Sequence, residues 1–452
     1  MKKKYLGLLL LGVAALGTAG FIGGSREQRL VVHEWGTFTS LQGSDGVPLR
    51  WNPLESSRLP QFVYNWGHSG VGRYPSGLLS FGTKQAIVTL QRMETPVIYF
   101  YSDKEQRVDL SVRFPKGGIT EWYPQAPEVG PSSFPPSRTV AALDSGLHHC
   151  GFSPNFTLAS MFSPGAVKES VIHWPDLKVL PTSSHAKIAK LLPTDSSGSH
   201  YFAARETDSA FVQVPSLSPT NSGHEFEKFL FYRGVGNFVT PLNVSMKSEG
   251  AITVVNTGKE PLSHLFILRV TGQQGGFVSL NGLKTGESRD LPLDLNRQSQ
   301  PLDNVRTQIR QEMAHALAAE GLYPREATAM VNTWDDSWFA EEGIRVLYIL
   351  PRAWTDEILP MKMDPKPKEL VRVMVGRAEL VGLDVENNLT HALVQAQQGE
   401  SGAGQEVKTM VAKLGRFAGP VFNQALARAD IQPSDRDQLM ALLYEGRSAS
   451  RR

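Results

Sequence analysis

The chain of 452 residues contains a single cysteine, Cys150, and this excludes a disulfide within the chain. Stability must therefore come from packed cores rather than from covalent cross-links. Cys150 also lies far from the N-terminal region, so no cysteine stands near a processing site where a lipid could be attached.

An excess of charge of one sign is also lacking. The 46 Lys and Arg residues nearly balance the 44 Asp and Glu residues, which leaves a net charge of +2. No stretch of the chain gathers basic residues into a stripe. A nucleic acid is therefore not an expected partner.

No complete catalytic motif is present. Residues 67–70 read Gly-His-Ser-Gly and resemble the nucleophile elbow of a serine hydrolase, but Val71 stands where the last glycine belongs. No strand–turn–helix pattern surrounds this segment. A serine hydrolase is therefore disfavoured.

The histidines do not form a metal-binding pattern either. His148 and His149 precede Cys150, but adjacent residues on a strand point to opposite faces and cannot easily bind one ion. His315 lies on a helical pattern in which the first histidine of an H-E-x-x-H motif is missing. We therefore predict no metal site and no cofactor.

Residues 1–24 have the pattern of an export signal. Three lysines at positions 2–4 precede an apolar run over residues 6–22, and small residues at 17–19 have the spacing of a cleavage site. An uncleaved membrane anchor formed by residues 5–22 is the alternative. Either reading predicts a protein exported to the periplasm or cell envelope, with membrane contact only through this segment.

The remaining chain favours an α+β fold. Its 29 prolines and 41 glycines predict many turns, and short apolar strands dominate residues 25–300 as one or two antiparallel, β-sandwich-like modules. Residues 301–382 predict a mixed helix–strand segment packed on the β region. Residues 383–447 predict a C-terminal helical appendage.

Residues 30–41 predict the first strand of the mature chain. Alternation places His33, Trp35 and Thr37 on one face and Glu34 on the other, unless a bulge intervenes. This geometry opposes joint catalysis by the neighbouring His33 and Glu34. Residues 87–90 and 96–102 predict two further strands.

Residues 324–351 connect an amphipathic helix with two tryptophans to an apolar strand at 344–350. Four acids near the helix end are unfavourable for the helix dipole. A break near residues 332–333, with Thr333 or Asp336 capping a second helix, is one explanation. Cations such as Arg345 and Arg352, or a ligand, are the other.

Paired carboxylates in an aromatic-lined cleft are the requirement for glycoside hydrolysis. The eight tryptophans include several that stand beside acids, at 34–35, 121–122 and 334–335. Tryptophan beside an acid is also ordinary at the edge of a core. The pattern therefore supports a glycan-acting hydrolase only as an alternative.

Four stretches, LVVHEWGTFTS, METPVIYFYS, EKFLFYRGVGNF and SWFAEEGIRVLYILPR, resemble a family of large exported bacterial proteins without an assigned function. The resemblance covers about residues 33–380 and implies export and one shared architecture, but no activity. It directs attention to polar residues within these stretches: His33, Glu34, Glu94, Tyr232, Arg233, Asp336, Glu341 and Glu342.

From these observations we predict a binding or assembly module of the cell envelope, whose partner is an envelope glycan or another envelope protein. The alternatives are a glycan-acting hydrolase with paired carboxylates and a metal-dependent hydrolase. The candidate catalytic acids are Glu34, Glu94, Asp336, Glu341 and Glu342. The candidate ligand-binding residues are His33, Trp35, Tyr232, Arg233, Trp334 and Trp338.

Overall fold

The structure is a computed structural model that describes residues 30–54, 59–65, 88–130, 168–181, 185–196, 198–216, 223–248, 250–292, 299–429 and 431–449. It confirms the α+β fold class: several antiparallel sheets are followed by helices that lie mostly in the C-terminal part of the chain. The predicted export signal, the serine segment at 67–70 and the cluster at 148–150 lie outside the described residues.

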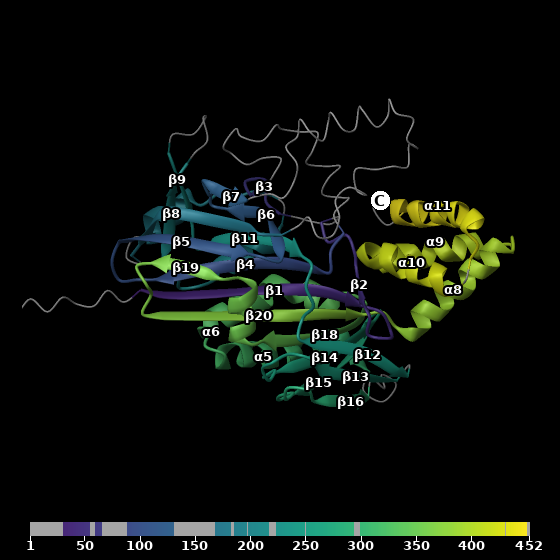
Figure 1. The fold of residues 1–452 in the computed structure, drawn as a ribbon. Helices are drawn as coiled ribbons and strands as arrows, with labels where there is room; N and C mark the ends of the chain where they lie inside the picture. The colour runs from purple at the N-terminus through teal and green to yellow at the C-terminus, as the bar shows by residue number, and fades with distance from the viewer. Residues whose placement is uncertain are drawn as a thin grey trace, which may run out of the picture.

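The largest sheet of the described residues has eleven strands (Figure 1). Its strand order is β17 (Gln300–Pro301), β15 (Gln274–Leu280), β14 (Leu265–Thr271), β18 (Gly343–Leu350), β20 (Glu369–Leu380), β1 (Val31–Gln42), β4 (Gln91–Tyr101), β11 (Leu230–Gly236), β6 (Gly117–Tyr123) and β3 (Tyr64–Asn65), with β2 (Pro48–Leu49) paired to β1. The sheet therefore joins strands from both sides of residue 301.

Two smaller sheets are antiparallel. One contains β10 (His224–Glu227), β9 (Phe211–Pro215), β8 (Ser170–Leu180), β5 (Gln106–Phe114) and β19 (Met361–Asp364), with β7 (Glu128–Gly130) paired to β8. The other contains β12 (Leu242–Ser248), β13 (Ala251–Asn256) and β16 (Ser288–Pro292). Buried residues of all three sheets belong to one hydrophobic core.

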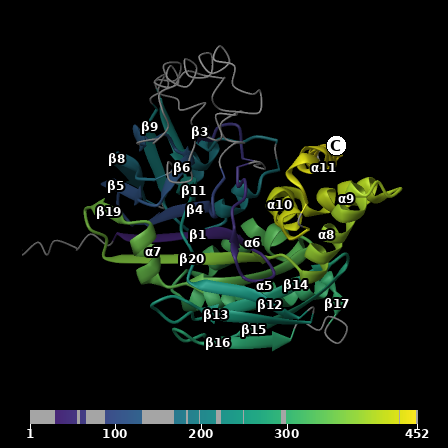
Figure 2. The same cartoon turned by 45° about the vertical axis from the view of Figure 1, so that its right-hand side comes forward.

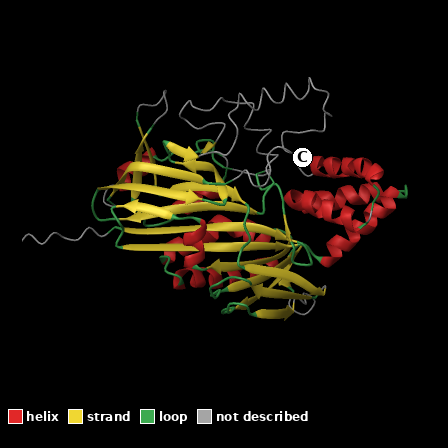
Figure 3. Cartoon of the chain, in the orientation of Figure 1, coloured by secondary structure: helices red, strands yellow, loops and turns green. Residues whose placement is uncertain are grey.

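Two groups of helices accompany the sheets, and they are separated clearly in Figure 3. The first group consists of α3 (His185–Ile188), η4 (Ala189–Leu191), η5 (His200–Arg205), α5 (Leu302–Ala319), α6 (Pro324–Asp335), η6 (Asp336–Ala340) and α7 (Arg352–Ile358). The second group, which we call the helical unit, consists of α8 (Leu383–Gln397), α9 (Ala403–Leu414), η7 (Gly415–Phe417), α10 (Ala418–Arg428) and α11 (Pro433–Ala449).

The helical unit has its own core, which also contains Leu41 of β1, Trp51, and Val381, the residue that follows β20. The turned view of Figure 2 shows α8 to α11 beside the sheet rather than on top of it. No helix among the described residues has both the length and the apolar character that crossing a membrane requires.

Strand β1 lies in the middle of the large sheet, where it pairs in parallel with β20 and antiparallel with β4. The predicted alternation along β1 is confirmed. His33 contacts Glu326 of α6, whereas Phe38 on the other face packs on Trp354 of α7. We call these the α6 face and the α7 face. Because both faces are covered, nearly every residue of β1 is buried.

Of the two strands predicted at 87–90 and 96–102, the second is confirmed up to residue 101, whereas residues 88–90 belong to no named strand and residue 87 lies outside the described residues. One continuous strand, β4, covers Gln91–Tyr101, and Pro96 lies inside it. Pro96 is tolerated because the pairing of β4 with β1 shifts register there. At such a bulge one residue makes no backbone hydrogen bond to the neighbouring strand, so the missing N–H of proline costs little.

The prediction of a helix break near residues 332–333 was wrong. Helix α6 runs through both residues to Asp335 and continues in the π-helical turn η6. The hydroxyl of Thr333 donates to the carbonyl of Ala329 at 2.7 Å, so it does not cap a second helix.

Cations hold the acids at this helix end, as the second explanation proposed, but they are different cations. Asp335 pairs with Arg306 and Arg310. The two arginines named from the sequence bind other acids: Arg345 pairs with Glu379, and Arg352 pairs with Asp356.

Candidate functional site

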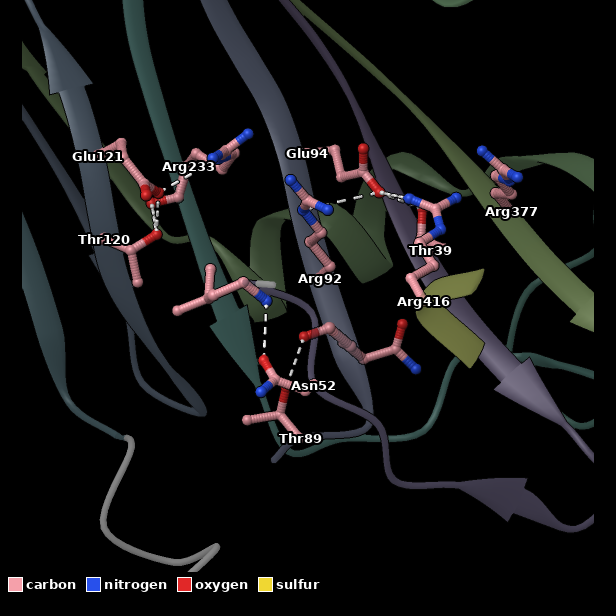
Figure 4. A network of polar contacts seen from close by, with 12 residues as sticks. Thr39, Asn52, Thr89, Arg92, Glu94, Thr120, Glu121, Arg233, Arg377 and Arg416 are labelled. Atoms are coloured by element: carbon pink, nitrogen blue, oxygen red, sulfur yellow. Dashed lines mark hydrogen bonds and ion pairs between the residues drawn. The ribbon is translucent and has the colours of Figure 1, made fainter. Parts of the chain in front are cut away.

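The α6 face of the large sheet carries a group of charged side chains near the C-terminal end of β1 (Figure 4). These side chains come from β4, β11 and β20 and from the turn η7 of the helical unit. We define the arginine cluster as Arg92, Glu94, Arg233, Arg377 and Arg416.

Glu94 lies at the centre of the cluster. Thr39 on β1 donates a hydrogen bond to its carboxylate at 2.9 Å. Arg92 and Arg416 approach the same carboxylate oxygen at 3.8 and 3.6 Å. Glu94 therefore links the first strand, its neighbour and the helical unit.

Glu341 lies on the solvent-facing side of the cluster, where its side chain is 45% exposed and pairs with Arg377. One of its oxygens accepts hydrogen bonds from Arg377 at 2.6 Å and from Arg416 at 3.3 Å. Arg416 contacts both Glu341 and Glu94, so one guanidinium group is shared by these two carboxylates. They are the two candidate catalytic acids that the fold brings together.

The arginines keep both of these carboxylates ionised. Burial alone would raise the pKa of Glu94, but Arg92, Arg416 and Arg377 outweigh burial and lower the pKa to about 2. Glu341 responds in the same way. Burial raises its pKa, whereas Arg377 and Arg416 lower it more strongly, to about 2.

The guanidinium groups of the cluster repel one another. Burial lowers the pKa of Arg92 to about 10; Arg233 and Arg416 lower it too, and Glu94 acts in the opposite direction. Arg92 thus remains protonated at neutral pH. A cluster of this kind attracts negatively charged groups.

The backbone is irregular beside Glu94. The ladder from β1 to β4 shifts between Trp35 and Thr37, and the next residue after Glu94, Thr95, has φ 52°. A β-branched residue adopts positive φ only under strain. Bulges of this kind redirect side chains and are frequent beside functional sites.

Glu34 lies on the opposite, α7 face and does not belong to the cluster. Its carboxylate accepts a hydrogen bond from the hydroxyl of Tyr232 and pairs with Arg372 at 2.6 Å. Arg372 also binds Asp356 of α7 at 2.7 Å. Glu34 and Arg372 are fully buried, so this network fastens β1 to β20 and α7.

His33 also lies on the α6 face, but nearer the N-terminal end of β1 than the arginine cluster. Its Nδ1 atom is 2.6 Å from a carboxylate oxygen of Glu326, and both side chains are fully buried. The same oxygen accepts the backbone N–H of Tyr323 at 2.9 Å. The pair therefore joins β1 to the start of α6.

The three candidate tryptophans are core residues. Trp35 packs on Tyr99, and Trp334 stacks on Trp338 with ring centroids 6.3 Å apart. Trp334 is 3% exposed, and the other two are fully buried. Trp334 also packs against His200, with the centroids of the two rings 5.1 Å apart.

The last two candidate acids lie outside the cluster. The Asp336 side chain is 95% exposed and contacts Arg306 at 3.1 Å. Glu342 is exposed, and it is its backbone carbonyl that accepts from Arg345, at 3.3 Å. Among the candidate ligand-binding residues, Arg233 belongs to the cluster and binds Glu121 at 3.1 Å.

Within the described ranges, no group of three or more His, Cys, Asp and Glu side chains is arranged to hold a metal ion. His173 lies between two carboxylates, since Glu128 and Asp109 each lie 3.0 Å from one of its ring nitrogens. These hydrogen-bond contacts use both ring nitrogens.

Three arginines of the cluster were missed from the sequence: Arg92, Arg377 and Arg416. Arg92 and Arg377 stand next to apolar residues in strands that are largely buried, and that is a usable signal, because a buried charge requires a partner. Arg416 gave no such signal, since it lies in a helical turn. Glu326 was also missed, although glutamate three residues into a helix is a common cap.

No family model matches the chain, and no curated protein matches it well enough to count as a relative.

Proposed function

We propose that this chain is an exported binding protein of the cell envelope rather than an enzyme that uses paired carboxylates. The observation that carries the proposal is the state of Glu94 and Glu341. These are the candidate acids that share one guanidinium, and both have a pKa of about 2.

A glycosidase needs one carboxyl group that is protonated near neutral pH, because that group protonates the leaving oxygen. A carboxyl group with a pKa of about 2 is ionised at any pH near neutrality. Contacts with Arg377 and Arg416 also occupy the oxygen of Glu341. The arrangement therefore favours recognition of a ligand over hydrolysis.

The hydrolase remains a second candidate for one reason. Both Glu94 and Glu341 contact Arg416, at 3.6 and 3.3 Å, so their carboxylates lie within the range of about 10 Å that glycosidases use. Binding of a substrate between them would be needed to free one acid from its arginines.

The experiment is to incubate the purified chain with envelope glycans and measure co-sedimentation together with the release of reducing ends. We expect binding without release. Release that disappears in both Glu94→Gln and Glu341→Gln would establish the hydrolase instead. Lys413→Gln, an exposed change on α9, is a control for altered surface charge.

Export is tested separately by fractionating cells that express the chain with a C-terminal tag. We expect the chain outside the cytoplasm, and N-terminal sequencing then distinguishes cleavage near residue 19 from retention as an anchor. Recovery of the chain in the cytoplasm, with residues 2–4 still present, would contradict export.

A further inference from the structure

Two arginines converge on the solvent-facing edge of the arginine cluster. The side chain of Arg377 is 1% exposed and that of Arg416 is 15% exposed, yet both donate to a single oxygen of Glu341, which is 45% exposed. Glu341 follows the π-helical turn η6 and lies before β18. Its carboxylate therefore occupies a position that an oxyanion from solvent can reach.

Other groups hold both arginines in place. The Nε–H group of Arg377 donates a hydrogen bond to Glu379, which also binds Arg345 at 3.0 Å. Arg416 contacts Glu94 at 3.6 Å, and its guanidinium lies 4.8 Å from the ring of Phe417. Movement of Glu341 alone would leave two oriented guanidiniums, and paired guanidiniums bind carboxylates and phosphates strongly.

Uncharged polar groups lie on the same face. Within the described parts of the chain, the hydroxyl of Thr37 and the indole N–H groups of Trp334 and Trp338 are buried without a hydrogen-bond partner. Each of these side chains is more than nine-tenths buried. Buried polar atoms are normally paired, so these three atoms retain hydrogen-bonding capacity for a ligand with polar groups of its own.

Their position relative to the cluster follows from the sheet and from η5. Thr37 is paired with Glu94 across β1 and β4. His200 of η5 contacts Trp334, and its Nε2 atom is buried without a partner among the described residues. Burial is the main cause that lowers the pKa of His200 to about 4; Glu94 acts in the opposite direction and Arg233 in the same one, so the imidazole is neutral at pH 7.

The combination of charged and neutral groups selects one ligand class. Guanidiniums suit an oxyanion, whereas indole N–H groups, a hydroxyl and a neutral imidazole suit the hydroxyl groups of a sugar. We propose that this edge of the arginine cluster binds an acidic glycan, with its carboxylate or phosphate taking the place of Glu341 on Arg377 and Arg416. This inference rests on the proposed binding function and specifies its ligand.

The experiment is calorimetric titration of the full chain with two probes of equal length, an oligogalacturonate and a neutral oligogalactose. We expect the acidic probe to bind at least about tenfold more tightly, because charged hydrogen bonds contribute most of the affinity. Arg416→Gln should remove about tenfold or more of that affinity. Arg377→Met should do the same if the variant folds, and Arg416→Gln decides alone if it does not.

Glu341→Gln should change the affinity for the acidic probe in the opposite direction to the arginine variants. It therefore separates a role in binding from a purely structural one. Removing the competing carboxylate should tighten binding of the acidic probe by roughly threefold or more. A purely structural salt bridge predicts no gain, so unchanged or weakened binding in folded Glu341→Gln overturns the proposal. Lys413→Gln should leave both affinities unchanged.

The two proposals fail in different ways. If neither probe nor any envelope glycan binds, the binding function itself is wrong. If neutral and acidic probes bind equally and Arg416→Gln changes neither, only the acidic-glycan site is wrong. If inorganic phosphate binds as tightly as the oligogalacturonate, the site recognises a free oxyanion and the glycan part of the inference is overturned.

Discussion

Arg372 and Glu34 form a salt bridge of 2.6 Å in which both side chains are fully buried, and it joins the first described strand of the large sheet to its last in sequence order. The pair joins β1 to β20, and these two strands form the only parallel pairing among the described residues. Because parallel strands are connected through long stretches of chain, this contact closes the fold over more than three hundred residues.

Glu34→Gln should therefore destabilise the protein strongly. The change leaves the buried guanidinium of Arg372 without its carboxylate partner, and such losses reduce the free energy of unfolding by about 3–5 kcal/mol. Urea denaturation followed by circular dichroism measures the difference. Glu105→Gln is the matched control, because Glu105 pairs with Lys178 while 55% exposed. Equal effects from the two variants would refute a special role for the buried pair.

A second prediction concerns attachment of the helical unit. Glu386 of α8 is 1% exposed and accepts the backbone N–H of Ser44 at 2.8 Å, the hydroxyl of Ser44, and the guanidinium of Arg428. Glu386→Gln should lower the stability of this contact by about 1.5–3 kcal/mol, since hydrogen bonds to a charged acceptor are lost. Native-state proteolysis should then cut within residues 383–449 before the sheets.

The control for this prediction is Glu406→Gln, an exposed position on α9. It should leave the proteolysis pattern unchanged. If Glu386→Gln instead accelerates cleavage everywhere to the same extent, the helical unit and the sheets unfold together, and the contact at Ser44 does not act as a separate attachment.

Local patterns in the sequence predicted individual elements well. The alternation along β1 placed His33 and Glu34 on opposite faces, and the apolar run at 344–350 is β18, Gly343–Leu350. These features depend on neighbouring residues, which periodicity reports directly. The α+β class followed from the same information.

Long-range pairing was not accessible in this way. The contacts of Glu94 with Arg416 and of His33 with Glu326 join residues hundreds of positions apart, and no local pattern specifies them. The bulge beside Glu94 was also hidden, because Thr95 is a β-branched residue that ordinarily avoids positive φ. The sequence therefore supplied two acids of the site, Glu94 and Glu341, but not the arginines that determine their chemistry.

A third prediction concerns acid. The pKa of Glu94 is about 2 in the folded chain against an ordinary value of 4.5, so its ionised form stabilises the fold above pH 4.5. That stability is lost as the pH falls through the window from about 4.5 to about 2. The buried shift corresponds to roughly 3 kcal/mol. Chemical denaturation at a series of pH values measures the slope.

Glu94→Gln should be less stable at neutral pH and should lose less additional stability between pH 4.5 and pH 2. Glu342→Gln, an exposed neighbour of the cluster, should retain the slope of the parent chain. An unchanged slope in Glu94→Gln would mean that the arginines do not hold the pKa of Glu94 low.

The last prediction tests the packing of the sheet beside the candidate site. Gly376 lies in the middle of β20, and a Cβ atom there would lie 2.2 Å from Cζ of Tyr348, a fully buried ring on β18. Overpacking of a closed core reduces the free energy of unfolding by about 1–3 kcal/mol, and Gly376→Ala should show at least this loss in urea denaturation. Gly250→Ala is the control, because a Cβ atom at Gly250 meets nothing within 4 Å. In a Tyr348→Ala background, where the ring is absent, Gly376→Ala should have little effect. If the substitution is as harmful without the ring as with it, the backbone of β20, and not the contact with Tyr348, requires glycine at this position.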